Sequence, residues 1–176
     1  SLYGLVFQNF NLFPHYSVMK NITDAPIHVQ KRDKKEVESE ARELLRKMGL
    51  EDKADAYPCQ LSGGQCQRVA IARALAVEPQ IIICDEATSA LDPNTTKSIL
   101  QLLKQINKDL GVTVIVITHE MAVIEAICDR VAIIDKSHIA ESGKVSEIFS
   151  EPKSKIGRQL ILGDAVETGN FGGGRQ

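Results

Sequence analysis

Two short runs of the sequence carry residue types that can handle a phosphate and a metal ion. The run Leu61-Ser62-Gly63-Gly64-Gln65 predicts a turn that opens a helix, and such a turn presents unpaired backbone N–H groups to an anion. Further along, the apolar strand Ile81-Ile82-Ile83-Cys84 ends in Asp85-Glu86, a carboxylate pair that suits a magnesium ion and a polarised water. Together the two runs indicate half of a nucleotide-hydrolysis site.

The other half of such a site is not found. A phosphate-cradling loop reads Gly-x-x-x-x-Gly-Lys-Ser/Thr, and none of the 12 glycines fits that pattern. The pair Gly143-Lys144 fails because it is followed by Val145. Since the chain also opens at Ser1 without an initiator methionine, we interpret it as a piece of a larger ATPase subunit.

The helices that must position these runs are predicted by their caps and apolar spacing. Ser62 and Gln65 stand in capping-box register, so a helix should start at the Gly-Gly pair and stop at Glu78-Pro79. Apolar residues at helical spacing predict another helix over 33–48. Asp92-Pro93 predicts the start of a third helix. Gly49 is placed to end the helix over 33–48, and Gly111 to end the helix that starts at Asp92-Pro93. A fourth helix is expected to carry the apolar residues Met121, Ile124 and Ile127.

Apolar runs between these helices predict strands at 2–7, 81–84 and 112–117, and we expect the last two to be covered on both faces. Two more strands, 131–135 and 139–141, should pair with each other. Alternating strands and helices indicate an α/β protein with a parallel sheet. Gln8, Asp85-Glu86 and His119 each follow a strand, and the carboxyl ends of parallel strands meet at one edge, so these residues are expected to share a site.

Composition bounds the class of protein. The 176 residues are enough for one well-buried core, and we expect one compact unit followed by a glycine-rich, disordered tail over 163–176. A formal net charge of -2 argues against a nucleic-acid-binding groove. No run approaches the 18 or so apolar residues of a membrane span. The 4 cysteines show no Cys-x-x-Cys spacing, which favours reduced thiols.

Each signal taken alone has a plainer explanation. Ser62-Gly63-Gly64 could be a tight turn with a helix cap, and Asp85 could be an ordinary carboxylate at the end of a strand. Adjacent Asp85 and Glu86 are harder to dismiss, because like charges repel unless a cation or donors compensate them. A zinc helix beginning at His119-Glu120 would need a second histidine where the chain has Val123. The remaining histidines have no partner pattern and are interpreted as structural: His15, His28 and His138.

The order of the motifs resembles that of an ATP-binding-cassette (ABC) transporter ATPase. Gln8 is similar to its glutamine loop, 61–65 to its signature, 81–86 to its Walker B segment, 89–92 to its aspartate loop and Thr118-His119 to its switch histidine. The resemblance covers residues 1–162. It implies a P-loop NTPase-like, mainly parallel sheet that lacks the Walker A portion, with a helical subdomain at about 22–75 that carries the signature.

Within that superfamily two neighbouring subfamilies are indicated. The stretch from Gln8 to Pro14 and on through 55–58 resembles the ATPases of polar-amino-acid importers. The stretches 84–93 and 129–135 look more like the methionine-importer ATPases. The resemblance therefore implies ATP hydrolysis coupled to uptake of methionine or a polar amino acid.

The resemblance also implies roles for the residues that match its hydrolytic motifs. Asp85 would hold Mg²⁺ through water, Glu86 would act as general base or orient the water, and His119 would contact the γ-phosphate of ATP. Gln8 would sense the metal ion and the water. The remaining motifs act between subunits: Ser62, Gly63, Gly64 and Gln65 would bind the γ-phosphate held by a second ATPase subunit, and Asp92 would bridge the two.

The implied partners follow from the same family. They are a second ATPase subunit in a homodimer, transmembrane permease subunits and, through the permease, an extracytoplasmic substrate-binding protein, with no nucleic acid. The implied location is the cytoplasmic face of the membrane, with the loop over 8–14 near the permease. Without the phosphate loop, we expect the chain alone to bind ATP poorly and to be inactive. Two alternatives stay open: a non-catalytic module that completes a partner's site, and an ABC ATPase without a transport role.

Overall fold

A computed structural model describes residues 2–163, which fall into two compact units. The first runs to His119 and the second begins at Glu120, so the expectation of one compact unit is wrong for these residues. The elements of the first unit are β1 (Tyr3–Phe7), α1 (Val18–His28), α2 (Lys34–Lys47), α3 (Gly63–Ala76), β2 (Ile81–Asp85), α4 (Pro93–Leu110) and β3 (Thr113–Ile117). Those of the second are α5 (Met121–Ile127), β4 (Arg130–Asp135), β5 (His138–Lys144), α6 (Val145–Ser150) and α7 (Lys155–Leu162).

The first unit is built on a three-stranded parallel sheet in the order β1-β2-β3. The register aligns Phe7 with Asp85 and Asp85 with Ile117, so the three strands end together at one edge. Chain segments containing helices connect the strands, as parallel pairing requires. The predicted α/β class and the parallel arrangement are confirmed.

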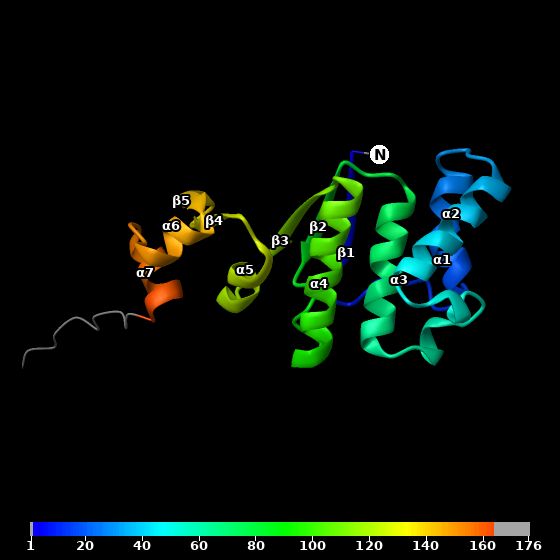
Figure 1. Cartoon of the computed structure of the whole chain (residues 1–176), viewed down its shortest axis with the longest axis horizontal. Helices are drawn as coiled ribbons and strands as arrows, with labels where there is room; N and C mark the ends of the chain where they lie inside the picture. Colours follow the sequence, from blue (N-terminus) through cyan, green and yellow to red (C-terminus); the bar gives the residue numbers. More distant parts are fainter. Residues whose placement is uncertain (1, 164–176) are drawn as a thin grey trace, which may run out of the picture. The chain divides into compact units, whose positions relative to one another are not determined.

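Helices α3 and α4 lie side by side against the sheet, and α1 and α2 pack on the outer side of α3 (Figure 1). Small side chains on α3 let it approach the strands closely. A Cβ added to Gly4 of β1 would lie 2.7 Å from the carbonyl oxygen of Ala74, so β1 needs a glycine there. The core between these elements consists of buried apolar side chains, among them Val6, Ile22, Leu45, Ile71, Ile82, Ile99 and Leu103.

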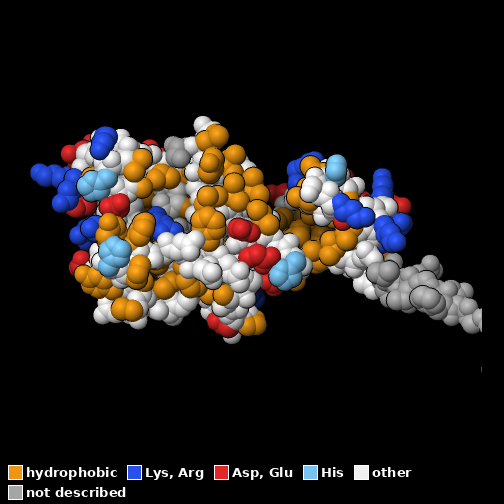
Figure 2. Space-filling view, turned by 180° about the vertical axis from the view of Figure 1, so that it is seen from behind, with side chains coloured by type: hydrophobic (Ala, Val, Ile, Leu, Met, Phe, Trp, Pro, Cys, Tyr) orange, Lys and Arg blue, Asp and Glu red, His pale blue; other side chains and the backbone are white. Residues whose placement is uncertain are grey.

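The opposite face of the sheet is only partly covered within the described residues. Hydrophobic side chains gather there over the strands (Figure 2). The exposed ones include Tyr3 and Leu5 of β1 and Ile115 and Ile117 of β3. The prediction that 81–84 and 112–117 are covered on both faces is therefore wrong, because the described helices of this unit pack against one face and β3 has only β2 as a neighbour.

The cap that the sequence predicts at Asp92 is confirmed, because its carboxylate accepts hydrogen bonds from the amides of Asn94 and Thr95 at the start of α4. Asp33, which the sequence analysis did not identify as a cap, accepts in the same way from the amides of Lys35 and Glu36 at the start of α2. Gly49 and Gly111 adopt the left-handed conformation just past the ends of α2 and α4, with φ of 68° and 65°.

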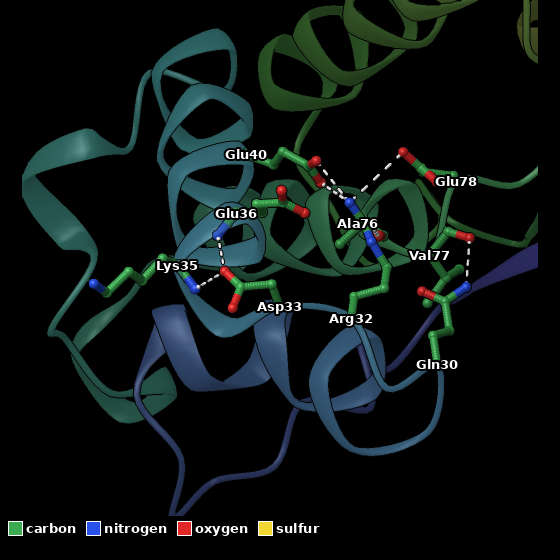
Figure 3. A network of polar contacts seen from close by, with 9 residues as sticks. All are labelled: Gln30, Arg32, Asp33, Lys35, Glu36, Glu40, Ala76, Val77 and Glu78. Atoms are coloured by element: carbon green, nitrogen blue, oxygen red, sulfur yellow. Dashed lines mark hydrogen bonds and ion pairs between the residues drawn. The ribbon is translucent and has the colours of Figure 1, made fainter.

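Side chains from the loop between α1 and α2 close the carboxyl end of α3 (Figure 3). Gln30 Nε2 donates to the Val77 carbonyl at 3.0 Å, and Arg32 Nη1 donates to the Ala76 carbonyl at 3.3 Å. Arg32 also forms a bidentate pair with Glu40, both contacts being 2.6 Å. The last carbonyls of α3 thus receive donors that the helix itself cannot supply.

The second unit contains the antiparallel hairpin β4–β5, which confirms the predicted strand pair. Lys136 and Ser137 at its turn both have positive φ, as a type I′ turn requires. Glu141 of β5 accepts hydrogen bonds from the backbone N–H groups of Lys153 and Ser154, which tie α7 to the hairpin and lower the pKa of the Glu141 carboxyl.

In the described residues we find no helix with both the length and the apolar character needed to cross a bilayer. The predicted disordered tail falls, apart from Gly163, outside the described residues. Assignment of 1–162 to one cassette domain and of about 22–75 to a helical subdomain stays a prediction.

Candidate functional site

The aligned ends of the three strands bring the predicted hydrolytic residues to one edge of the sheet. Gln8 follows β1, Asp85 ends β2, and His119 lies two residues after β3. Gln8 occupies a turn closed by a 3.1 Å hydrogen bond from the Phe10 amide to the Phe7 carbonyl. The observed register brings these residues to one edge of the sheet, as the sequence predicts.

Glu86 and His119 are in direct contact at this edge. Glu86 Oε1 lies 2.9 Å from His119 Nδ1. Because a carboxylate can only accept, the hydrogen of this bond belongs on Nδ1. The Glu86 side chain is 28% exposed and that of His119 is 76% exposed, so the pair is open to solvent and to a substrate. The arrangement holds a carboxylate and an imidazole together where a water can reach both.

The backbone around Glu86 is held by several hydrogen bonds. Its amide donates to the Ile117 carbonyl at 2.9 Å, and its carbonyl accepts from the Ser89 hydroxyl at 2.8 Å. Glu86 has a φ of 50°, which costs about 1–3 kcal/mol for a residue with a side chain and is common at functional sites. One residue on, buried Gln67 of α3 donates from Nε2 to the Ala87 carbonyl at 2.6 Å. Hydrogen bonds with β3 and with α3 thus hold the loop that carries Glu86 in place.

The residues at this edge fit a magnesium ion by the chemistry of their donors. Exposed Asp85 and the Gln8 amide offer oxygen ligands, which Mg²⁺ prefers. Within residues 2–163 no three side chains of the types His, Cys, Asp and Glu gather as a metal cluster. Mg²⁺ needs no such cluster, since it is commonly held by one or two carboxylates together with phosphates and water.

The predicted anion site forms the start of α3. Ser62 is the N-cap: its Oγ accepts from the Gln65 amide at 3.2 Å, while Gln65 Oε1 accepts from the Ser62 amide at 2.9 Å. This is the predicted capping box. Ser62 and Gly63 are exposed, so the start of the helix, with its positive dipole end, faces solvent. Gln65 uses its side chain to build the turn.

Both glycines of this turn lie close to neighbouring motifs. A Cβ on Gly63 would sit 3.4 Å from Leu91 Cδ2 and 3.7 Å from Phe10 Cζ. A Cβ on Gly64 would sit 2.5 Å from Thr95 Cγ2, which is too close for any real contact. Gly64 therefore allows the turn to pack closely against the start of α4, whereas a Cβ at Gly63 would make ordinary contacts with Leu91 and Phe10.

Asp92 is the N-cap of α4. Its Oδ1 accepts from the amides of Asn94 and Thr95, both at 3.1 Å, and its Oδ2 accepts from the Thr95 hydroxyl. The bonds from Thr95 and from the Asn94 amide lower the pKa of the Asp92 carboxyl. A role for Asp92 between subunits remains a prediction, because the contacts described here lie within the chain.

The sequence analysis missed Arg73 and Thr95. Arg73 donates to two carbonyls of the loop after Gln8, and Thr95 joins Gly64 to Asp92. Arg73 looks like any helix cation in the sequence, and no spacing rule connects it to residues more than sixty positions earlier. Tertiary packing alone places Arg73 at the site, whereas the bond from Thr95 to Asp92 is local and only the approach of Thr95 to Gly64 is tertiary.

Comparison with known proteins agrees with these motifs. The family described as ABC transporter matches residues 2–89 of the chain. The methionine import ATP-binding protein MetN of Pasteurella multocida is 54% identical over 158 residues, which cover 90% of this chain and 46% of that protein. The corresponding protein of Haemophilus influenzae is 51% identical with the same coverage. The chain thus spans about half the length of the curated relatives it matches.

Solved structures show the same likeness. The dimeric structure of a bacterial ABC transporter cassette superposes with a TM-score of 0.69 at 40% identity, covering 82% of this chain and 63% of that chain. A post-hydrolysis state of the cassette bound to ADP and Pi gives the same values. The predicted P-loop NTPase-like fold is therefore confirmed.

Proposed function

Because this chain belongs to the ABC transporter family, we propose that it forms part of the ATPase subunit of an amino-acid importer. The subunit couples ATP hydrolysis to uptake of methionine or a polar amino acid. The names of the relatives, methionine import ATP-binding proteins, favour methionine.

The observation that carries this proposal is the 2.9 Å contact between Glu86 and His119 at the carboxyl edge of the sheet. Glu86 orients the attacking water or takes its proton, and His119 contacts the γ-phosphate. Asp85 would hold Mg²⁺ through water, and Gln8 would sense the ion and the water. Magnesium, when bound with ATP, neutralises charge that develops on the phosphates. These residues supply placement and electrostatics, which dominate catalysis of phosphoryl transfer.

The start of α3 serves the second nucleotide site of a homodimer. Ser62 and the amides of Gly63 and Gly64 bind the γ-phosphate of ATP held by the other subunit, with Gln65 fixing the turn. The capping box and the exposure of this end support that role. Asp92 lies at the neighbouring helix start, where it reports approach of the second subunit.

The loop after Gln8 supplies a surface for the permease. Phe13, His15 and Tyr16 form a partly exposed ring cluster, with the Phe13 and Tyr16 centroids 5.2 Å apart. Asn21 fixes this loop through hydrogen bonds to Phe13, Tyr16 and Ser17. Docking there would place the subunit at the cytoplasmic face of the membrane, with the substrate-binding protein reached only through the permease.

The hydrolytic residues are tested in a fusion that places the amino-terminal part of the Pasteurella multocida relative, with its phosphate loop, ahead of this chain. We expect ATP turnover that falls about 100-fold or more with Glu86→Gln, since a general base contributes at least that much. Glu125→Gln, at an exposed position on α5, is the matched control and should retain turnover. Equal activity of the two variants would contradict the role of Glu86.

The signature is tested with the chain as it stands, which has no phosphate loop and should not hydrolyse ATP alone. It is mixed with an intact relative whose own signature serine is replaced by glutamate. Turnover that appears only in the mixture would show that α3 completes the relative's site. Turnover in this mixture without turnover in the fusion would favour the alternative of a non-catalytic module.

A further inference from the structure

Helix α3 donates hydrogen bonds to the loop that follows Gln8. Arg73, in the last turn of α3, donates from Nη1 to the Asn11 carbonyl at 2.6 Å and from Nη2 to the Phe10 carbonyl at 3.0 Å. Between β1 and α1 the chain passes behind α3 (Figure 1). One guanidinium therefore holds two successive peptide groups of the loop.

The backbone of this loop needs such support. Phe10 and Asn11 have φ of 60° and 48°, and this left-handed conformation is unfavourable for residues with a side chain, more so for Phe10 than for Asn11. The same Phe10 amide closes the turn that contains Gln8 by donating to Phe7. If Phe10 relaxes to an ordinary conformation, the turn opens and Gln8 moves with it.

Attraction to the helix dipole alone does not explain why an arginine stands at position 73. A cation in the last turn is favoured by the helix dipole, and an exposed lysine would satisfy that preference. Arg73 is instead desolvated, which lowers its pKa. Among the ion pairs of residues 2–163 none involves Arg73, so the two loop carbonyls are the acceptors that compensate for its burial.

A second contact joins the same loop to the start of α3. The Phe10 ring lies beside Gly63, with Cζ 3.7 Å from the position of an added Cβ. The loop thus touches the helix at the signature turn and again near Arg73, nearly three helical turns later. Any shift of α3 is transmitted to Phe10 from both places.

We propose that Arg73 is a positioning residue that fixes Gln8 relative to the signature helix, so that the loop and α3 move as one body. The inference rests on the proposed function for what Gln8 does, but its geometric content needs no nucleotide. In the transporter, a movement of α3 caused by phosphate binding at Ser62 would then also move Gln8.

The test is NMR relaxation of the full, isotopically labelled chain without nucleotide. Backbone order parameters of residues 8–11 should fall from about 0.85 to below about 0.6 with Arg73→Met, and the Gln8 side-chain amide signals should shift. Arg73→Lys, which keeps a charge but has no fork of donors, should give intermediate values. The lysine variant also carries the test if the methionine variant fails to fold.

Arg68→Met is the matched control. Arg68 lies on the same helix, is also half-buried, and donates to the Met48 carbonyl at 2.9 Å and to Ser98 Oγ at 2.7 Å, away from the loop. It should lower the melting temperature while leaving residues 8–11 rigid. Equal loosening of the loop in both variants, or an unchanged Gln8 in Arg73→Met, would overturn the proposal. A rigid loop in Arg73→Met together with active mixtures would overturn this inference alone and leave the proposed function standing.

Discussion

The amino-terminal end of α3 faces solvent, whereas its carboxyl end is closed by side chains from another loop. At the first end Ser62 and Gln65 satisfy part of the backbone and leave the turn exposed. At the second end Gln30 and Arg32 donate to the last carbonyls, and Glu40 holds Arg32 in place (Figure 3). Every helix leaves N–H groups unpaired at its start and carbonyl groups unpaired at its end, so the difference between the two ends of α3 is set by the rest of the fold.

The difference separates a binding end from a supporting end. Closing the carboxyl end fixes the helix, and leaving the amino-terminal end open keeps its N–H groups available to an anion. Changes at the open end should therefore affect partner-dependent turnover, while changes at the closed end should affect stability.

The largest expected effect is on turnover at the open end. Ser62→Glu places a carboxylate where the phosphate must bind, and we expect turnover of the mixture with the signature-disabled relative to fall about 100-fold, as for loss of an oxyanion donor. Ser17, the N-cap of α1, accepts from the Lys20 amide and offers the matched variant Ser17→Glu. A similar loss of turnover in both variants would remove the distinction between the two caps.

The next effect is on stability at the closed end. Arg32→Met leaves the Ala76 carbonyl without its side-chain donor, which should lower the free energy of unfolding by about 2 kcal/mol. The melting temperature should then fall by about 4–8 °C in calorimetry. The control is Arg46→Met: Arg46 also pairs with two glutamates, Glu43 and Glu51, but on an exposed surface, so its loss should change little. Equal shifts would mean that closing the helix end contributes nothing special.

A smaller effect is expected where the open end packs on α4. Gly64→Ala brings a Cβ against Thr95 Cγ2 and should destabilise the chain by about 1 kcal/mol, since overpacking outweighs the better helix propensity of alanine. Thr95→Ser removes that methyl group and keeps the hydroxyl that donates a hydrogen bond to Asp92. In urea unfolding, the double variant should be at least as stable as Thr95→Ser alone. A double variant less stable than that would show that the clash lies elsewhere.

The smallest effect concerns pH. The pKa of Asp92 is lowered in the folded chain, so its contribution to stability is present above the unfolded value near 3.8 and is lost as pH falls through the lower folded value. Asp92→Asn retains a good N-cap without the charge and should flatten the dependence of the melting temperature on pH below about pH 4. A wild-type slope that persists in Asp92→Asn would assign the effect to another carboxylate, with Glu141 as the next candidate.

Local patterns predicted most elements of the first unit. The capping box at Ser62, the cap at Asp92 and the left-handed ends at Gly49 and Gly111 all lie where the sequence indicates. These features depend on residues within one or two turns of each other, so a single sequence carries them. Coverage of the sheet was predicted wrongly, because an apolar run looks the same whether one face or both faces are packed.

By itself, the sequence determined which residue types follow each strand and which turn opens α3, since both are properties of neighbouring residues. Tertiary structure alone decided that Glu86 meets His119, that Gln30 and Arg32 close α3, and that Arg73 holds the loop after Gln8. These contacts join residues between 33 and 63 positions apart. Their partners are set by strand register and helix packing, which no local pattern encodes.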